Sequence, residues 1–251
     1  MIEAVTFDWW DTMALTTEEQ DGQLRELRIE RLAMAVPDLP RTREALLQAY
    51  DRQQAVLEEA WARNVDPAPE DQIQTFLTFA GLDPGDAVLV DRVSEAFGGA
   101  LLEIPPALFP HVPETLEELK REGVAIGLVS NTGRTWGRYI RRVQDRLGIG
   151  RHFDVRIFSD EVGLRKPLPE IFEAALEGLG LPADRVVHVG DDVEADVIGA
   201  KDVGMRAVWF QTDRRGYRPG YRRRPEMSTD RADAVVHDLA EVPRTLRMWR
   251  S

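Results

Sequence analysis

The chain contains no cysteine, and only four of its 251 residues are histidine. The first absence excludes disulfide frameworks, cysteine-ligated zinc, iron–sulfur clusters and thiol nucleophiles. The histidines do not stand at metal-ligand spacing, so no histidine-rich metal site is expected. These two scarcities remove cysteine-based and histidine-based metal sites from consideration.

Long apolar runs and excess positive charge are also missing. No run approaches the length of a membrane span, and the N-terminus shows neither a basic region nor a cleavage site. The 44 acidic residues outnumber the 32 basic ones, and the net charge of −12 gives a surface that repels nucleic acid and anionic membranes. We therefore expect a cytoplasmic protein with a small-molecule substrate, no nucleic-acid partner and no membrane partner. The sequence leaves the oligomeric state open.

Positive charge gathers in one short segment. Residues 214–225 hold six arginines together with glycine and proline. This composition is typical of a solvated loop, and an anion-binding flap is the alternative interpretation.

A long helical stretch follows a single strand near the N-terminus. Residues 2–7 form a short β-rich run, and the pattern is helical from about residue 16 to residue 105. Gly81, with Pro84 beyond it, marks the end of one helix. Apolar residues at helical spacing predict four helices, around residues 24–32, 46–61, 73–80 and 90–97. We interpret residues 16–105 as an inserted α-helical cap.

Strands and helices alternate in the remainder of the chain. Strand-like apolar runs occupy residues 124–129, 155–158, 186–189, 205–210 and 234–236, with helix-like segments such as 113–122, 169–178 and 194–203 between them. This alternation is typical of βαβ units and a parallel sheet. The predicted fold class is α/β, with a doubly wound, Rossmann-like core of residues 1–15 and 106–251 that the cap interrupts.

Polar side chains follow the strands that should border one crevice of this sheet. Ligands of open parallel sheets bind at the carboxyl ends of the strands. Any one of these residues has an ordinary explanation as a loop or N-cap residue, but together they indicate a site. In chain order they are Asp8, Thr12, Ser130, Asn131, Lys166, Asp191, Asp192 and Asp196.

The ordered set resembles the four motifs of the haloacid dehalogenase-like hydrolase superfamily, in its form with a helical cap between the first two motifs. Phe7–Thr12 resembles the first motif, Val129–Asn131 the second, Lys166–Pro167 the third and Gly190–Asp196 the fourth. The second and third motifs are short, but the four in order span the chain. The resemblance implies a doubly wound core, a cap and hydrolase activity.

The resemblance also implies a role for each matching residue. Asp8 would be the nucleophile that forms a covalent aspartyl intermediate. Thr12 and Ser130 would position the nucleophile and the transferring group, and Asn131 would add a hydrogen-bond donor for the substrate phosphate. Lys166 would neutralise charge on the nucleophile and on the substrate oxygens.

A magnesium ion is the cofactor that the resemblance implies. Asp8, Asp191 and the backbone carbonyl of Trp10 would hold it, in line with the preference of Mg2+ for oxygen ligands. Asp196 would orient the lysine of the third motif or a metal-bound water, and Asp192 would act as an N-cap or as a ligand through water. Two or three carboxylates in one crevice repel each other unless a cation lies among them.

Position 10 departs from the family pattern. Phosphatases of the superfamily carry a second aspartate two residues after the nucleophile as general acid and base, and this chain has Trp10 there. Indole does not exchange protons with a leaving alkoxide or with water at useful rates, so the Trp10 side chain is expected to pack at the interface of cap and core and to shape the substrate site. Asp11 is adjacent, but alternation along an extended segment would point it away. Losing acid–base help, typically worth about 10²–10⁴-fold, would hinder alkyl phosphates far more than good leaving groups.

Three interpretations follow, in order of preference. The first is a Mg2+-dependent phosphatase restricted to good leaving groups such as acyl or aryl phosphates, or one that borrows an acid from the cap or the substrate. The second is a catalytically weak relative that binds a phosphorylated ligand or a protein. The third is a 2-haloacid dehalogenase, since halide leaves without a proton and those enzymes carry an aromatic residue here; however, they work without metal and lack an equivalent of Asp191. A cap arginine such as Arg25 or Arg28 would then bind a carboxylate, although charged helical faces favour solvated side chains.

Overall fold

The computed structural model describes residues 1–36, 43–213 and 231–250, so the arginine-rich segment 214–225 lies outside the described residues. Its main sheet consists of β1 (Ala4–Phe7), β4 (Ala125–Ser130), β5 (Val155–Phe158), β6 (Val186–Gly190), β7 (Arg206–Phe210) and β8 (Ala234–Val236). All neighbouring strands are parallel, in the order β5-β4-β1-β6-β7-β8. The chain winds outward from β1 in both directions, which creates a crevice at the carboxyl ends of the central strands. The predicted doubly wound α/β fold is confirmed.

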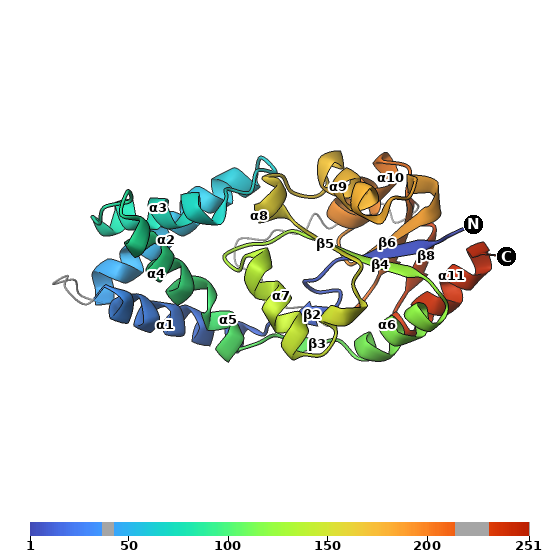
Figure 1. Cartoon of the computed structure of the whole chain (residues 1–251), viewed down its shortest axis with the longest axis horizontal. Coiled ribbons are helices and arrows are strands. Elements are labelled where there is room, and N and C mark those ends of the chain that lie inside the picture. Colours follow the sequence, from blue (N-terminus) through green and yellow to red (C-terminus); the bar gives the residue numbers. More distant parts are fainter. Residues whose placement is uncertain (37–42, 214–230, 251) are drawn as a thin grey trace.

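Helices cover both faces of this sheet (Figure 1). One face carries α6 (Val112–Arg121), α7 (Gly137–Arg146) and α11 (Val242–Arg250), and the other carries α9 (Pro169–Leu179), the π-helical segment η3 (Val193–Ile198) and α10 (Gly199–Asp202). Successive strand residues point to opposite faces, so Val5 and Phe7 join the first layer and Ala4 joins the second. A short helix, α8 (Ser159–Val162), follows β5.

A separate group of helices lies between β1 and β4 in the chain and to the left of the sheet in Figure 1. Its members are α1 (Glu18–Ala35), α2 (Arg43–Trp61), α3 (Pro69–Ala80), α4 (Ala87–Gly98) and α5 (Ala100–Glu103). A capping box of Thr17 and Gln20 starts α1, and Gly81, at a φ of 63°, ends α3 as predicted.

A two-stranded antiparallel ribbon connects these helices to the sheet. It pairs β2 (Ala14–Leu15) with β3 (Ala107–Leu108), so the chain leaves and re-enters the sheet side by side. The ribbon lies beside the boundaries predicted for the cap, residues 16–105, and those boundaries stay a prediction. We keep the word cap for helices α1 to α5.

The helix α7, which carries four arginines in ten residues, is not predicted from the sequence. Its buried apolar residues are Tyr139, Ile140 and Val143. Tyr139 and the preceding Trp136 pack in the hydrophobic cluster of the cap helices, so α7 ties the cap to the sheet. Within the described ranges, no helix is long and apolar enough to cross a membrane.

Candidate active site

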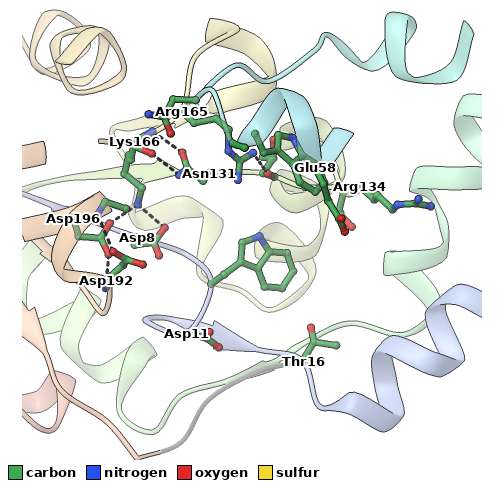
Figure 2. Close-up of a pocket in the computed structure, with 18 of the residues that line it drawn as sticks. Asp8, Asp11, Thr16, Glu58, Asn131, Arg134, Arg165, Lys166, Asp192 and Asp196 are labelled. Carbon is green, nitrogen blue, oxygen red and sulfur yellow. Dashed lines mark hydrogen bonds and ion pairs between the residues drawn. The ribbon is translucent and has the colours of Figure 1, made fainter. Parts of the chain in front are cut away.

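Lys166 joins two buried carboxylates at the carboxyl end of the sheet, as Figure 2 shows. Its Nζ lies 2.7 Å from Asp8 Oδ1 and 2.6 Å from Asp196 Oδ1, and it donates to the Val129 carbonyl at 2.8 Å. These contacts use all three donors of the ammonium group. Burial alone would lower the pKa of Lys166, but Asp196 and Asp8 more than offset this and raise the pKa. The side chain is therefore charged.

Strand register explains why these groups meet. Phe7 pairs with Val189 of β6, and the N–H of Asp8 donates to the Val189 carbonyl at 2.9 Å, so the loops after β1 and β6 start at the same edge. Gly190 leaves room for the fourth motif, because a Cβ at this position would lie 2.2 Å from Asp196 Cγ. A glycine is therefore required where Asp196 folds back over the end of β6.

Asp196 is held from several directions. Its Oδ1 also lies 3.2 Å from His188 Nε2, and its Oδ2 accepts from the Asp192 N–H at 2.9 Å. Burial and the charge of Lys166 lower the pKa of His188, and the other ring nitrogen, Nδ1, lies 2.8 Å from Thr6 Oγ1. Burial would raise the pKa of Asp196, but Lys166 and His188 lower it. Asp196 is thus fixed beside Lys166, and its role in orienting that lysine stays a prediction.

A third carboxylate completes the cluster. Oxygens of Asp8, Asp191 and Asp196 lie within 4.8 Å of one another, and all three residues are buried. Asp191 Oδ1 accepts from Thr12 Oγ1 at 3.4 Å, and the Asp191 carbonyl accepts from Trp209 Nε1 at 2.9 Å. Three buried carboxylates beside one ammonium leave an excess of negative charge, and oxygen donors suit Mg2+. These residues therefore fit a divalent cation.

The other residues predicted for the site make positioning contacts. Asn131 Oδ1 accepts from the Lys166 N–H at 2.7 Å, and its Nδ2 donates to the Lys166 carbonyl at 3.1 Å. Ser130 is buried, and its Oγ donates to the Asn131 carbonyl at 3.3 Å. Asp192 is an N-cap, one of its two predicted roles, because its Oδ1 accepts from two N–H groups of η3 at 2.8 Å. The second-motif loop thus holds the third-motif loop.

A cavity of about 530 Å³ adjoins the cluster, and residues of both the sheet edge and the cap line it. Of the predicted site residues, Thr12, Ser130 and Asp191 are outside this lining. Those that belong to the lining are Asp8, Trp10, Asn131, Lys166, Asp192 and Asp196. Trp10 forms part of the cavity wall, and its ring packs edge-on against that of Trp9, with ring centroids 6.1 Å apart.

Two expectations about neighbouring residues are wrong. The expected orientation of Asp11 assumes an extended backbone, but its φ is 60° and its side chain lines the same cavity. Arg28, expected in solvent, is buried and lines the cavity, whereas Arg25 is at the surface and pairs with Asp51 at 2.8 Å. Helical spacing does not reveal which charged face meets the rest of a bundle.

Asp66, in the loop after α2, is a buried carboxylate that accepts hydrogen bonds from four side chains, and no sequence motif indicates it. Its Oδ1 accepts from Trp61 Nε1 at 2.9 Å. Its Oδ2 accepts from the hydroxyls of Thr132, at 3.1 Å, and Ser159, and from Arg165 at 2.7 Å. A single cap carboxylate therefore joins the loops that follow β4 and β5. In the sequence it resembles any aspartate of a turn.

Replacing Asp66 by alanine is expected to lower the free energy of unfolding by about 3 kcal/mol or more, because it removes one partner of a buried charge pair. Urea denaturation measures the change. Asp51→Ala, which breaks an exposed ion pair with Arg25, is the matched control and should cost less than about 1 kcal/mol. Equal losses of unfolding free energy in the two variants would show that the buried contacts of Asp66 do not stabilise the fold more than an exposed ion pair does.

Comparisons with known proteins agree with the motif pattern. The family model of haloacid dehalogenase-like hydrolases matches residues 2–204. The phosphoserine phosphatase of Thermus thermophilus is 34% identical over 202 residues, which are 79% of this chain and 72% of that protein. The glyceraldehyde 3-phosphate phosphatase of Methanothermobacter thermautotrophicus is 41% identical over 107 residues, which are 42% of this chain and 45% of that protein. The match spans about half the length of this protein and of two further phosphatases, from Halopiger xanaduensis and Methanocaldococcus jannaschii.

A solved structure gives the same result over the whole fold. The 2-haloacid dehalogenase from Pseudomonas syringae pv. Tomato DC3000 has a TM-score of 0.69 and 26% identity, and the match covers 99% of this chain and 100% of that one. Sequence motifs, family model and fold therefore agree, and the chain belongs to the haloacid dehalogenase-like hydrolases.

Proposed function

We propose that this protein is a Mg2+-dependent phosphatase that acts through an aspartyl-phosphate on Asp8 and favours good leaving groups. The observation that carries this proposal is the carboxylate of Asp191 beside Asp8, in a buried cluster that Lys166 alone does not neutralise. The named phosphatases among its relatives support a small phosphorylated substrate.

The reaction has two steps. An oxygen of Asp8 attacks the phosphorus, and the bond between the phosphorus and the leaving oxygen breaks. Lys166, 2.7 Å from Asp8, orients the nucleophile and balances charge on the phosphoryl oxygens. Water then attacks the phosphorus of the aspartyl-phosphate, which releases phosphate and restores the carboxylate. Trp10 supplies no proton, so the leaving group departs as an anion, as acyl and aryl phosphates do.

Asp8, Asp191 and the backbone carbonyl of Trp10 would hold the Mg2+. When bound, the ion supplies Lewis-acid stabilisation of the phosphoryl oxygens. Thr12 and Trp209 keep Asp191 in place through the hydrogen bonds described above. The cap contributes the far wall of the cavity, which would limit access of water during the transfer.

Mg2+ is expected to raise the melting temperature of the wild type and to leave that of Asp191→Asn nearly unchanged. At a concentration 100 times its Kd, the ion adds about 2.7 kcal/mol to the free energy of unfolding. Thermal unfolding with Mg2+ and with EDTA measures the difference. Asp202→Asn, which alters a surface pair with Arg231, is the control and should keep the full shift. A full shift in Asp191→Asn would remove this residue from the metal site.

Hydrolysis of acetyl phosphate, p-nitrophenyl phosphate and 2-chloropropionate, each with Mg2+ and with EDTA, tests the proposed function. Phosphate release that needs Mg2+ supports the phosphatase. No turnover of any of the three would favour a relative that binds a phosphorylated ligand or a protein.

A 2-haloacid dehalogenase is the second candidate. Two observations favour it: the full-length match to a dehalogenase structure, and an aromatic residue, Trp10, in the cavity wall. Asp191 argues against it, since a halide displacement by Asp8 needs no metal ligand. Chloride release from 2-chloropropionate that is indifferent to EDTA would overturn our preference.

A further inference from the structure

Two buried arginines line the cavity away from the carboxylate cluster. Arg28 of α1 is 4% exposed, and Arg134, in the loop between β4 and α7, is 9% exposed. Figure 2 shows Arg134 on the opposite side of the pocket from Lys166 and Asp196. The cavity therefore carries positive charge at two separate places.

Among the described residues, the hydrogen-bond partners of Arg28 are all neutral groups. It donates to the Phe97 carbonyl at 3.2 Å, to the Tyr50 hydroxyl at 3.3 Å and to the Thr135 hydroxyl at 2.9 Å. These bonds fix the guanidinium at the cavity wall, but none of them neutralises its charge.

Arg134 is less completely satisfied. It donates to the side-chain oxygen of Gln54 and, through Nη2, to the Tyr50 carbonyl at 2.7 Å. Its Nη1 is buried and has no hydrogen-bond partner within the part of the chain that the structure describes. The guanidinium stacks on the Tyr50 ring, 3.5 Å from its centroid, which holds its plane. A buried donor of a charged group is rarely left unpaired in a folded protein, so we expect a bound ligand to supply an acceptor for this nitrogen.

Positive charge accumulates around this pair. Burial and the charge of Arg28 lower the pKa of Arg134 to about 10. Burial alone would raise the pKa of Tyr50, but the two arginines lower it. Asp21 lines the same cavity, yet burial raises the pKa of its carboxyl despite the arginines. Asp21 acts on both arginines, and Asp51 on Arg134, through charge at longer range. Among the described residues no carboxylate lies within ion-pair distance of either guanidinium, so these positions are left for an anionic ligand.

We propose that Arg28 and Arg134 bind a second anionic group of the substrate, a carboxylate or a second phosphate, while the reacting phosphoryl group lies at Asp8. Paired guanidiniums recognise both groups through charge-assisted hydrogen bonds. The placement of the reacting group rests on the proposed function. The substrate class is then a small phosphorylated acid or a bisphosphate, and phosphates of neutral groups are poor ligands.

Non-hydrolysable probes test this proposal by binding alone. Phosphonoacetate, 3-phosphonopropionate and 4-phosphonobutyrate present a phosphonate and a carboxylate at three separations, and their carboxamides are matched neutral controls. Isothermal titration with Mg2+ present should show at least one carboxylate that binds the wild type about tenfold or more tightly than its amide. Alkane bisphosphonates of the same lengths distinguish a second phosphate from a carboxylate. Equal affinity for charged and neutral probes at every length would overturn the proposal.

Variants then locate the effect. Arg28→Met and Arg134→Met should each reduce the preference for the charged probe to about twofold or less, whereas Arg25→Met, at the surface of the same helix α1, should keep it. A preference that survives in both cavity variants would overturn the assignment. If a cavity variant does not fold, the comparison of charged and neutral probes in the wild type still decides.

The two proposals fail separately. The probes do not turn over, so their binding does not depend on Asp8 chemistry. A chain that discriminates charged from neutral probes but hydrolyses no phosphate would retain the anion site and lose the phosphatase proposal. A chain that hydrolyses acetyl phosphate but binds charged and neutral probes equally would retain the phosphatase proposal and lose the anion site.

Discussion

Asp8→Asn is expected to reduce phosphate release by at least about four orders of magnitude, in the range seen when a covalent nucleophile is removed. The amide has the size of the carboxylate but cannot attack phosphorus and retain the product as an acyl phosphate. Lys166 keeps Asp196 and the Val129 carbonyl as partners, so the fold should survive. Steady-state turnover of acetyl phosphate, with circular dichroism and thermal unfolding as fold checks, measures the loss.

Trapping the intermediate makes this prediction specific. Acid quenching of the wild type with labelled acetyl phosphate should retain label on the protein, on the peptide that contains Asp8. Asp51→Asn is the matched control, since it makes the same chemical change at an exposed ion pair far from the site in sequence. Turnover within tenfold of wild type in Asp8→Asn would exclude the covalent mechanism.

The parallel sheet and the positions of the principal candidate residues could be predicted because each depends on short-range pattern. Apolar runs identify the strands, and the rule that ligands bind at strand carboxyl ends places Asp8, Asn131 and Asp191 at one edge. The structure brings Asp8, Asp191 and Asp196 within 4.8 Å. The helix α7 escaped prediction because its apolar side is narrow and its arginines dominate the sequence.

The rest of the site depends on contacts between distant segments, which no local pattern encodes. Asp66 meets Arg165 across 99 positions, and Arg28 meets Thr135 across 107. Whether such a residue is solvated or buried depends on how the cap helices pack against the sheet. Asp11 shows a second limit, since one residue at φ 60° breaks the alternation that an extended segment would follow.

Trp10→Asp is expected to raise the hydrolysis of alkyl phosphates, such as glycerol 3-phosphate and O-phosphoserine, by about 10²–10⁴-fold. The introduced carboxyl can protonate the leaving alkoxide and later deprotonate water. Trp10 lies in the cavity wall, and the backbone pairing of residue 10 with Ala14 holds the loop, so the substitution reaches the site without moving the chain. The gain on acetyl phosphate should be much smaller, because its leaving group departs without a proton. Comparing kcat/KM for the two substrate classes measures the effect.

The variant Trp10→Asn distinguishes an effect of proton transfer from an effect of a larger pocket. Asparagine opens the same room as aspartate but neither donates nor accepts a proton, so a gain shared by both variants would come from a larger pocket. A gain confined to Trp10→Asp should bring a pH dependence of kcat/KM that the wild type lacks, with a new descending limb where the introduced carboxyl loses its proton. No gain in either variant would mean that the missing acid does not limit alkyl phosphate turnover. In that case the restriction would lie in recognition, and the Arg28–Arg134 pair is the next part of the cavity to vary.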